Sequence, residues 1–400
     1  MSERNKIHAS RDTSLNIAWA AHGGAAPGTA SLAEEFMSRF IPPDTFRMTD
    51  SHPDIILFMS GGSERRAIEL ADPERPVLLL SIRGNNAYAS ATEVMAWMTN
   101  NGRIAILSDA ADAAESGLLG NWQRVAAAWN KLKGSTAGLA GNVSEWLVAS
   151  DVSAETLLGR FGISLKAKPW SGLPDFTKSS PDRALMKRFD GQDNPDLEDA
   201  ARVLTLLRRV IRDNNLDAIA VECFSLVQER KVTACLALAQ LNAEGAVAAC
   251  EGDLASMAGM MAVKALTGSV PWMANTTRLT EKSIVLSHCT VPFDLVKDMT
   301  LRTHYETGFS LAVDGEINAS KVTVCRFSEK LDRAFIADGR IISRPRLADA
   351  CRTQVEIAIS QESVRELMEK PLGNHLLLLP GNHGELLRLA CRYKGIAFAG

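Results

Sequence analysis

Two carboxylates, Glu251 and Asp253, directly follow the run Ala246–Cys250 of small and β-branched residues. This run predicts a buried strand, and the helical spacing of apolar residues over 254–266 predicts a helix after it. In an open α/β sheet the ligand crevice lies outside the carboxyl ends of the strands. An acidic pair at such a place could bind a divalent metal or transfer protons. The alternative is that Asp253 only caps the following helix, a common role of Asp.

Further potential ligands lie at the ends of other predicted strands. Glu222 belongs to the apolar strand 218–223, where a carboxylate is costly unless it is paired or bound to a metal. It could equally lie at the exposed end of that strand. His288 follows the strand 284–286, either as a ligand or as a hydrogen-bonded core histidine.

The C-terminal third of the sequence adds two more candidate groups. His304 and Glu306 alternate at strand spacing and would share one face, although a solvated edge would give the same pattern. His383 stands in the segment 381–384, where flanking glycines let the backbone approach a ligand. Mixed carboxylate and imidazole ligands suit Mn²⁺, Fe²⁺ or Zn²⁺, whereas the sequence has no C-x-x-C pair for a structural zinc site.

The elements that must position these residues begin with strands alternating with helices. From residue 17 to residue 133, short apolar strands are each followed by a polar turn and an amphipathic helix. Such alternation predicts βαβ units and a doubly wound parallel sheet. A second α/β unit begins near residue 137, and we expect one sheet with the four strands 137–139, 218–223, 246–250 and 284–286.

The pattern changes after residue 301, where alternating or β-branched strands are expected at 309–313, 321–326, 334–342 and 354–359. Asp314-Gly315 and Asp338-Gly339 resemble turn signals between these strands. This segment predicts an antiparallel, barrel-like β domain with a terminal helix. The expected domains are therefore an N-terminal α/β domain at 1–136, a second α/β domain at 137–298 and a C-terminal β domain at 299–400.

Composition narrows the class of protein. A chain of 400 residues exceeds the roughly 250–300 residues that one core supports, so several domains are expected. The net charge of −3 provides no positive field for nucleic acid, and no apolar run reaches the ~18 residues of a membrane span. The polar N-terminus lacks the apolar core of a signal peptide, and the seven cysteines are scattered. We therefore expect a cytoplasmic protein with reduced thiols.

Four sequence motifs carry a resemblance to a known family, and they lie at 233–245, 248–254, 287–292 and 371–375. They resemble short members of the L-fucose isomerase / L-arabinose isomerase superfamily. The resemblance covers roughly residues 137–400 at the level of motifs, and only the architecture matches before residue 137.

The resemblance implies an Mn²⁺-dependent aldose–ketose isomerase. A cation bound to two adjacent sugar oxygens would acidify the C2 hydrogen and stabilise an enediolate, while side chains move the proton between C1 and C2. The family architecture also implies two α/β domains, a C-terminal β domain and a homo-oligomer (trimer or hexamer) whose site is closed by a neighbouring subunit. We expect no nucleic-acid or membrane partner.

Site residues follow from the family motifs and from the strand ends together. The expected metal ligands are Glu251, Asp253, His288 and His383. Proton transfer is assigned to Glu251 and Asp253, with Glu222 as a further catalytic carboxylate. His304, Glu306 and Asn382 are expected to bind the sugar.

One position departs from the family pattern. Short relatives carry Asp directly after Cys-Phe, whereas this chain has Ser225 after Phe224. Either Glu222 or Glu229 replaces the missing carboxylate, or the substrate carries its own anionic group. An anionic group could be received bidentately by an arginine at an N-terminal strand end, namely Arg65, Arg66 or Arg83.

Two other functions remain open on these residues. One is another metal-assisted reaction of a sugar, such as epimerisation or aldol-type cleavage. The other is a non-catalytic sugar-binding or regulatory protein of the same fold, a reading that Ser225 favours.

Overall fold

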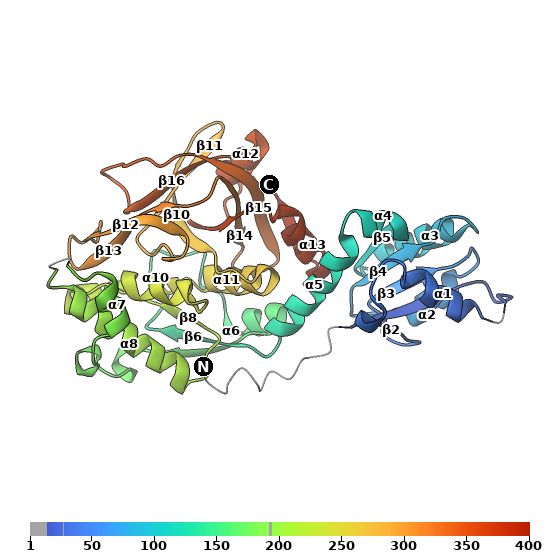
Figure 1. Ribbon diagram of the computed structural model, residues 1–400, viewed down its shortest axis with the longest axis horizontal. Helices are drawn as coiled ribbons and strands as arrows, with labels where there is room; N and C mark the ends of the chain where they lie inside the picture. Colours follow the sequence, from blue (N-terminus) through green and yellow to red (C-terminus); the bar gives the residue numbers. More distant parts are fainter. Residues whose placement is uncertain (1–13, 27, 192–193) are drawn as a thin grey trace. The chain divides into compact units, whose positions relative to one another are not determined.

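The computed structural model describes residues 14–26, 28–191 and 194–400 (Figure 1). It contains two parallel α/β sheets followed by a C-terminal six-stranded antiparallel β-barrel, which confirms the predicted fold class. Contacts divide the chain into two compact units. The first comprises the described residues up to Ala127 with Leu389–Gly395, and the second comprises Ala128–Arg388 with Ile396–Gly400. The three-domain boundaries expected at 136 and 298 stay a prediction.

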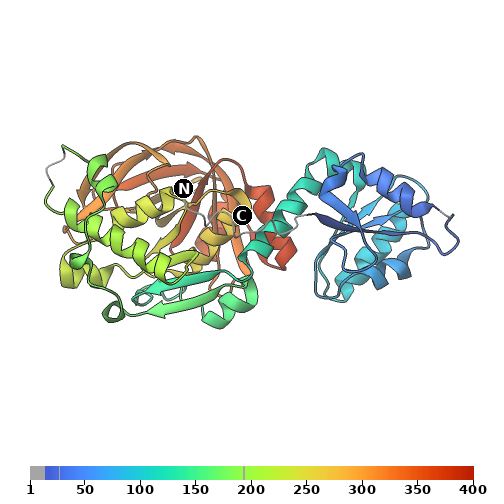
Figure 2. The same ribbon diagram turned by 60° about the horizontal axis from the view of Figure 1, so that its bottom comes forward.

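The first unit holds a five-stranded parallel sheet in the order β2-β1-β3-β4-β5. Its central strands are apolar at nearly every position because both faces of the sheet are covered by helices, as Figure 2 shows. The strands are β1 (Leu15–Ala20), β2 (Phe46–Met48), β3 (Ile55–Phe58), β4 (Val77–Ser81) and β5 (Ala105–Asp109), and the helices are α1 (Thr29–Met37), η2 (Pro43–Thr45), α2 (Glu64–Leu70), α3 (Ala87–Asn100) and α4 (Ala110–Glu115).

Two helices contain residues of both units, α5 (Leu118–Leu132) and α13 (Gly384–Lys394). In the first unit, the ring of Trp122 packs edge-on against Tyr393 with centroids 5.0 Å apart. The Trp122 Nε1–H also donates to the carbonyl of Asp54 at 3.1 Å. The C-terminal segment of the chain therefore contributes directly to the core of the N-terminal sheet.

The second unit begins with a four-stranded parallel sheet in the order β7-β6-β8-β9. Its strands are β6 (Thr136–Ala140), β7 (Ser164–Lys168), β8 (Ala218–Val221) and β9 (Val247–Cys250). Around it lie α6 (Ala154–Thr156), η3 (Leu157–Phe161), η4 (Trp170–Gly172), η5 (Phe176–Lys178), α7 (Arg183–Arg188), α8 (Leu197–Asp213), α9 (Phe224–Arg230), α10 (Cys235–Ala243) and α11 (Leu254–Thr267).

The expectation that residues 284–286 form the fourth strand of this sheet is wrong. These residues lie in β11 (Ser283–His288), which pairs antiparallel with two barrel strands. The fourth strand of the sheet is β7, a mostly exposed edge strand with two lysines and no apolar run. An apolar run indicates burial but does not identify the partner strand, and a polar edge strand gives no such signal.

The barrel closes in the order β14-β17-β10-β11-β16-β15, with β15 pairing back onto β14. Its other strands are β10 (Trp272–Leu279), β14 (Lys321–Phe327), β15 (Arg333–Ser343), β16 (Thr353–Ala358) and β17 (His375–Pro380). The short strand β18 (Ala397–Ala399) pairs in parallel with β15. A separate hairpin pairs β12 (Val296–Thr303) with β13 (Leu311–Ile317), and α12 (Gln361–Glu369) precedes β17.

Both expected turn signals of the barrel lie inside strands instead. Gly315 belongs to β13, where an added Cβ would lie 2.9 Å from the Cβ of Val296. Gly339 belongs to β15, where an added Cβ would lie 2.7 Å from the carbonyl oxygen of Ala358. These glycines therefore permit the close approach of neighbouring strands, which is a second common reason for glycine in a sheet.

Helix α11 joins the parallel sheet to the barrel. It contacts β8 and β9 on one side and β14 and β17 on the other, and Figure 1 shows it between the two layers. Almost all of its residues are buried, and at Gly259 an added Cβ would come within 2.8 Å of Leu377 in β17. The end of β9, where α11 begins, thus faces the ends of barrel strands.

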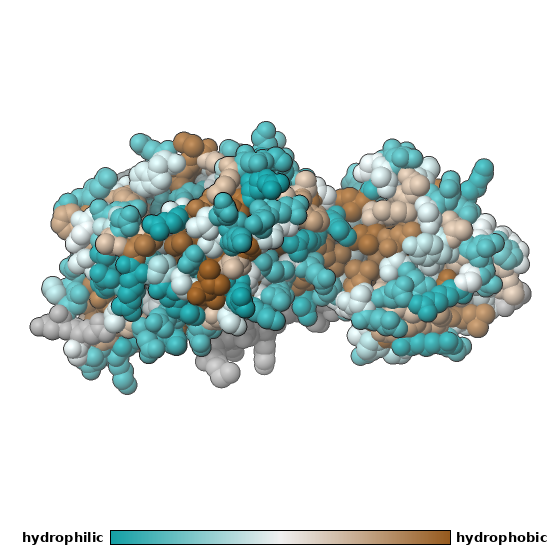
Figure 3. Space-filling view, turned by 90° about the horizontal axis from the view of Figure 1, so that it is seen from above, coloured by the Kyte–Doolittle hydropathy of each residue, from teal (hydrophilic) through white to brown (hydrophobic). Residues whose placement is uncertain are grey.

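Over the described residues, no helix is both long and apolar enough to cross a bilayer. On the face shown in Figure 3, hydrophilic residues cover most of the larger unit and hydrophobic residues lie in small groups. Exposed apolar side chains scattered in this way are normal for a folded protein.

Candidate metal and catalytic site

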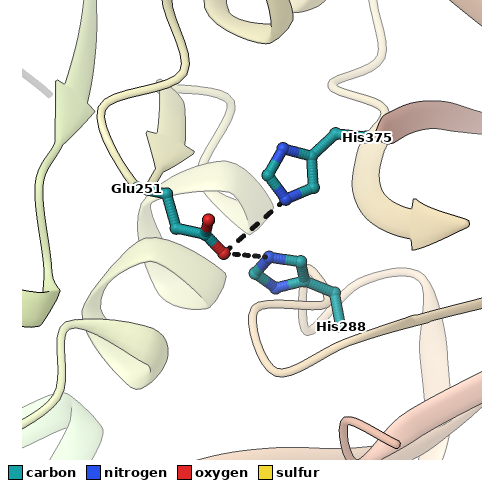
Figure 4. A group of neighbouring side chains, drawn as sticks. All are labelled: Glu251, His288 and His375. Carbon is teal, nitrogen blue, oxygen red and sulfur yellow. Dashed lines mark ion pairs between the residues drawn. The ribbon is translucent and has the colours of Figure 1, made fainter. Parts of the chain in front are cut away.

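Glu251, His288 and His375 converge where the parallel sheet meets the barrel (Figure 4). The carboxylate oxygen Oε1 of Glu251 lies 3.7 Å from Nε2 of His288 and 3.6 Å from Nε2 of His375. One ligand atom from each residue lies within 4.8 Å of the others, and all three side chains are buried. The three residues therefore form a compact group with the donor types of a divalent-metal site.

The barrel strands bring together two histidines that are far apart in the sequence. On one side of β10, Asn275 pairs with Ser287, the residue before His288 at the end of β11. On the other side, Asn275 pairs with His375, the first residue of β17. The two imidazole rings consequently lie with centroids 5.4 Å apart.

Glu251 reaches the histidines from a tight turn between β9 and α11. Its φ is 57° and that of Gly252 is 68°, so both occupy the left-handed region. For a residue other than glycine this conformation costs about 1–2 kcal/mol. At Gly252 an added Cβ would lie 2.3 Å from the carbonyl oxygen of Asn142, so the turn fits only glycine there. Strain of this kind persists where the surrounding structure enforces it and often marks a functional site.

The two oxygens of Glu251 have different surroundings. Oε2 accepts a hydrogen bond of 2.7 Å from Nε1 of Trp146, a half-exposed side chain in the loop after β6. That indole also packs edge-on against Phe224, with ring centroids 4.6 Å apart. Oε1 is left facing the two histidines. Trp146 thus fixes the carboxylate in the orientation that the group requires.

Asp253 orients His375 rather than joining the group directly. Its Oδ2 lies 2.8 Å from Nδ1 of His375 and accepts hydrogen bonds from Ser256 Oγ at 2.8 Å and from Arg326 Nη1 at 3.0 Å. Its Oδ1 accepts from the backbone N–H of Ser256 at 2.6 Å, which caps α11. Asp253 is therefore a helix cap and also a partner of a site histidine, as is common behind metal-binding imidazoles.

The Nε2 atoms of both histidines are suited to bind a metal ion. Each is buried without a hydrogen-bond partner among the described residues, although such atoms are costly to leave unsatisfied. Nδ1 of His375 is held by Asp253, which leaves Nε2 for a ligand bond. Nδ1 of His288 accepts a hydrogen bond of 2.9 Å from the N–H of Cys289 and lies 3.0 Å from the hydroxyl of Thr290. A metal on Nε2 of His288 would require the proton to move to Nδ1, which would then donate to Thr290 in place of accepting from Cys289.

The charges of the group are set by burial and by its neighbours. Burial disfavours the protonated form of His375, but its bonds to Asp253 and Glu251 outweigh this and raise its pKa to about 9. Burial lowers the pKa of His288. For Glu251, burial raises the pKa, but the two histidines lower it more, so its pKa falls far below the ordinary value. Without metal, the group therefore holds an anionic Glu251, a neutral His288 and a cationic His375.

His304 and Glu306 lie at the edge of this electrostatic network. His304 is buried, with Nδ1 3.0 Å from the hydroxyl of Thr307 and its ring edge-on to Phe224. Burial and the neighbouring His288 lower the pKa of His304 to about 4. Burial and the charge of Glu251 raise the pKa of Glu306, whose Oε2 lies 3.7 Å from Nε2 of His304. The pKa values of both groups therefore depend on the site, and their expected role in sugar binding stays a prediction.

Glu222 and His383 lie outside the group of three. Oε1 of Glu222 accepts from the N–H of Ser225 at 2.8 Å, and Oε2 accepts from Nε1 of Trp170 at 3.1 Å. His383 follows the far end of β17, where its Nε2 lies 2.9 Å from the carbonyl oxygen of Pro380. The adjacent Asn382 is exposed. The histidine that β17 contributes to the group is His375.

Sequence reasoning did not single out His375, Trp146 or Arg326. His375 stands at the end of the motif 371–375 and at the start of an apolar strand, and that position was the available signal. Trp146 and Arg326 carried no local signal, because their partners are distant in the sequence.

Comparisons with known proteins find distant relatives that are named isomerases. No protein-family model matches the chain. It is 24% identical over 287 residues to the sulfoquinovose isomerases of Priestia aryabhattai and of Priestia megaterium (strain ATCC 12872 / QMB1551). These matches cover 67% of this chain and 64% of each relative, so the chain spans less than two thirds of their length. The sulfoquinovose isomerase of Alkalicoccus urumqiensis is 25% identical over 203 residues, or 47% of this chain and 45% of the relative.

The affinity of the group for a divalent metal is expected to rise with pH. A metal ligand must be a neutral imidazole, so binding displaces the proton that His375 holds below pH 9. Apparent Mn²⁺ affinity should therefore increase by about tenfold per pH unit from pH 7 to pH 9 and then level off. Calorimetry in buffers of different ionisation enthalpy should show about one proton released at pH 7. An affinity that stays constant from pH 7 to pH 9 would contradict the proposed protonation state.

At the level of sequence, the chain is a distant homologue of sulfoquinovose isomerases, and its buried Glu251, His288 and His375 could bind a metal ion.

Proposed function

We propose that the protein is a metal-dependent aldose–ketose isomerase that acts on a sugar through an enediolate. The observation that carries this proposal is the pair of buried Nε2 atoms of His288 and His375, which face Oε1 of Glu251 and have no hydrogen-bond partner among the described residues. The isomerase names of the distant relatives support the reaction type. Membership of the L-fucose isomerase / L-arabinose isomerase superfamily, in its short fucose-isomerase-like branch, is part of the same proposal.

Glu251, His288 and His375 would hold the metal, which we propose to be Mn²⁺ or another divalent cation. Two imidazoles and one carboxylate leave coordination positions free for substrate oxygens. When bound, the cation supplies a Lewis acid that polarises a sugar carbonyl and stabilises developing negative charge on oxygen.

The side chains of the site divide the remaining work. Glu251 is the anionic group nearest the two histidines, and Trp146 holds its Oε2, so Oε1 can face the metal position without turning. The second role expected of this carboxylate, accepting a proton, stays a prediction. Glu306 has a raised pKa beside the neutral His304, as suits a group that returns a proton. Asp253 is fully occupied by four donors, so we assign it to orienting His375. The catalytic role expected of Glu222 stays a prediction.

We propose an acidic sugar as the substrate, because the distant relatives are named for sulfoquinovose, an acidic sugar. Arg352 offers a candidate partner for its anionic group. Its Nε donates to the carbonyl of Thr303 at 2.7 Å and its Nη2 to the Thr303 hydroxyl at 3.1 Å, and its guanidinium lies 5.8 Å from the Tyr305 ring centre. Within the described part of the chain, Arg352 has no carboxylate partner. It also contributes to the lowered pKa of His304, so its charge reaches the site.

The arginines considered for this role from the sequence are less suitable. Arg66 pairs with Asp50 at 3.2 Å, and Arg83 pairs with Asp112 at 2.6 Å and with Asp109 at 3.4 Å. Arg65 is exposed in the same N-terminal unit. We further propose a homo-oligomer, trimer or hexamer, in which a neighbouring subunit covers the site. The half-exposed Trp146, bonded directly to Glu251, supports a site that is open within one chain.

Isomerisation is tested by solvent exchange. Purified protein with Mn²⁺ is incubated with sulfoquinovose and with neutral hexoses in D₂O, and deuterium at C2 is measured by NMR. We expect exchange and ketose formation with sulfoquinovose. Glu251→Gln should reduce the rate by about 100-fold or more, since it removes both a ligand and a proton acceptor. The exposed Glu329→Gln serves as the control and should retain full activity.

The same assay separates the alternatives. Deuterium exchange at C2 without ketose formation would indicate epimerisation, and the appearance of shorter carbon chains would indicate aldol-type cleavage. A protein that binds sugar but produces no exchange in the presence of bound Mn²⁺ would be a sugar-binding protein, and the isomerase proposal would be wrong.

The role of Arg352 gives a separate prediction. Arg352→Gln should raise KM for the acidic sugar by about tenfold or more, because a hydrogen bond to a charged group contributes about 1.5–3 kcal/mol. A neutral sugar should be affected little. The matched control is Arg302→Gln, which breaks a surface pair with Asp314 on the neighbouring strand. Equal losses for acidic and neutral sugars would exclude Arg352 as the anion partner.

A further inference from the structure

Arg326 is a fully buried cation on β14, next to the candidate metal site but not part of it. Its Nη1 donates to Asp253 Oδ2 at 3.0 Å and to Ser256 Oγ at 2.5 Å. Its Nη2 donates to Ser150 Oγ at 2.7 Å. A charge buried this completely is very costly unless it is paired and hydrogen-bonded, so its partners identify its role.

The acidic partner of Arg326 is the residue that holds His375. Asp253 has no exposed surface, and the Oδ2 atom that receives the guanidinium also lies 2.8 Å from Nδ1 of His375. The chain of contacts therefore runs from Arg326 through Asp253 to His375, whose Nε2 faces Glu251. Only one side chain separates the buried cation from a candidate metal ligand.

The backbone leading into His375 also lies against the guanidinium. At Gly373, two residues before His375, an added Cβ would lie 2.7 Å from Nη2 of Arg326. Gly373 has a φ of 148°. Arg326 thus contacts the start of β17 from the barrel side while it holds Asp253 at the start of α11.

Arg326 lies in the barrel, whereas its three anchors lie elsewhere in the second unit. Ser150 is in the loop after β6, and Asp253 and Ser256 are at the start of α11. A guanidinium can serve all of them at once because its donors diverge in a rigid plane, which an ammonium group cannot reproduce.

We propose that Arg326 is a positioning residue for the metal site. It acts through Asp253 to fix the ring of His375 so that Nε2 points at the space shared with Glu251 and His288. It thereby makes the geometry of the site depend on the docking of the barrel against α11 and the parallel sheet. This inference rests on the proposed function, since it assumes that the metal binds at these three residues.

The test compares arginine variants in the full-length protein. Arg326→Lys keeps the positive charge but loses the diverging donors of the planar guanidinium. This variant should therefore fold but bind Mn²⁺ about tenfold more weakly. Arg326→Met leaves Asp253 buried without its cation and should bind more weakly still, with loss of stability. The control is Arg160→Lys: Arg160 donates through Nε and Nη2 to the carbonyl of Leu331 in the same unit and does not contact Asp253. Its Mn²⁺ affinity should equal that of the wild type.

A second readout does not require metal. In the metal-free wild type, NMR should show a deshielded Nδ1–H proton of His375 bonded to Asp253, and Arg326→Lys should shift or broaden it while Arg160→Lys leaves it unchanged. If wild type binds no Mn²⁺ but this signal responds as expected, the proposed function fails and the positioning role stands. If Arg326→Lys is folded, keeps wild-type Mn²⁺ affinity and leaves the His375 signal unchanged, the positioning role is overturned.

Discussion

The contact between Asp253 Oδ2 and His375 Nδ1, at 2.8 Å, joins the two layers on which the site depends. Asp253 begins the helix that follows the parallel sheet, and His375 begins a barrel strand. Neither layer alone contains the group, because Glu251 belongs to the sheet and both histidines belong to the barrel. A buried contact between two ionisable groups depends on further hydrogen bonds to those groups. Ser256 and Arg326 provide that satisfaction at Asp253.

Several features that are expected to destabilise the fold lie close to the candidate metal site. Glu251 adopts a left-handed backbone conformation, and the carboxylate of Asp253 and the guanidinium of Arg326 are fully buried. Nε2 of His288 and Nε2 of His375 have no hydrogen-bond partner among the described residues. Local features of this kind usually lower stability. They occur together where the ends of β9 and β11 meet the start of β17. A divalent ion bound as proposed would satisfy the two nitrogens and share the charge of Glu251.

The fold class could be predicted from the sequence because periodicity reports which faces of an element are buried. Helix α11 at Leu254–Thr267 matches the helix expected over 254–266, and the strand that ends at Cys250 was placed correctly. The pairing partners of the strands were harder to predict. The apolar run of β11 would suit a strand of either sheet, and β7 is a polar edge strand without an apolar run. Glycines such as Gly339 indicate close packing as readily as a turn, and only the neighbouring strand distinguishes the two.

The sequence correctly predicted that Glu251 and His288 lie at the ends of strands. Which histidine of the C-terminal segment joins them could not be predicted, because that depends on which end of β17 faces the parallel sheet. His375 precedes that strand's apolar run and His383 follows it, so the sequence alone favours His383, which lies beside glycines.

X-ray absorption spectroscopy on Mn²⁺- or Co²⁺-loaded protein tests the central claim most directly. The account predicts two imidazole nitrogens and carboxylate oxygen around the ion, and one imidazole fewer in His375→Ala. A shell without imidazole, or a shell unchanged in His375→Ala, would contradict it.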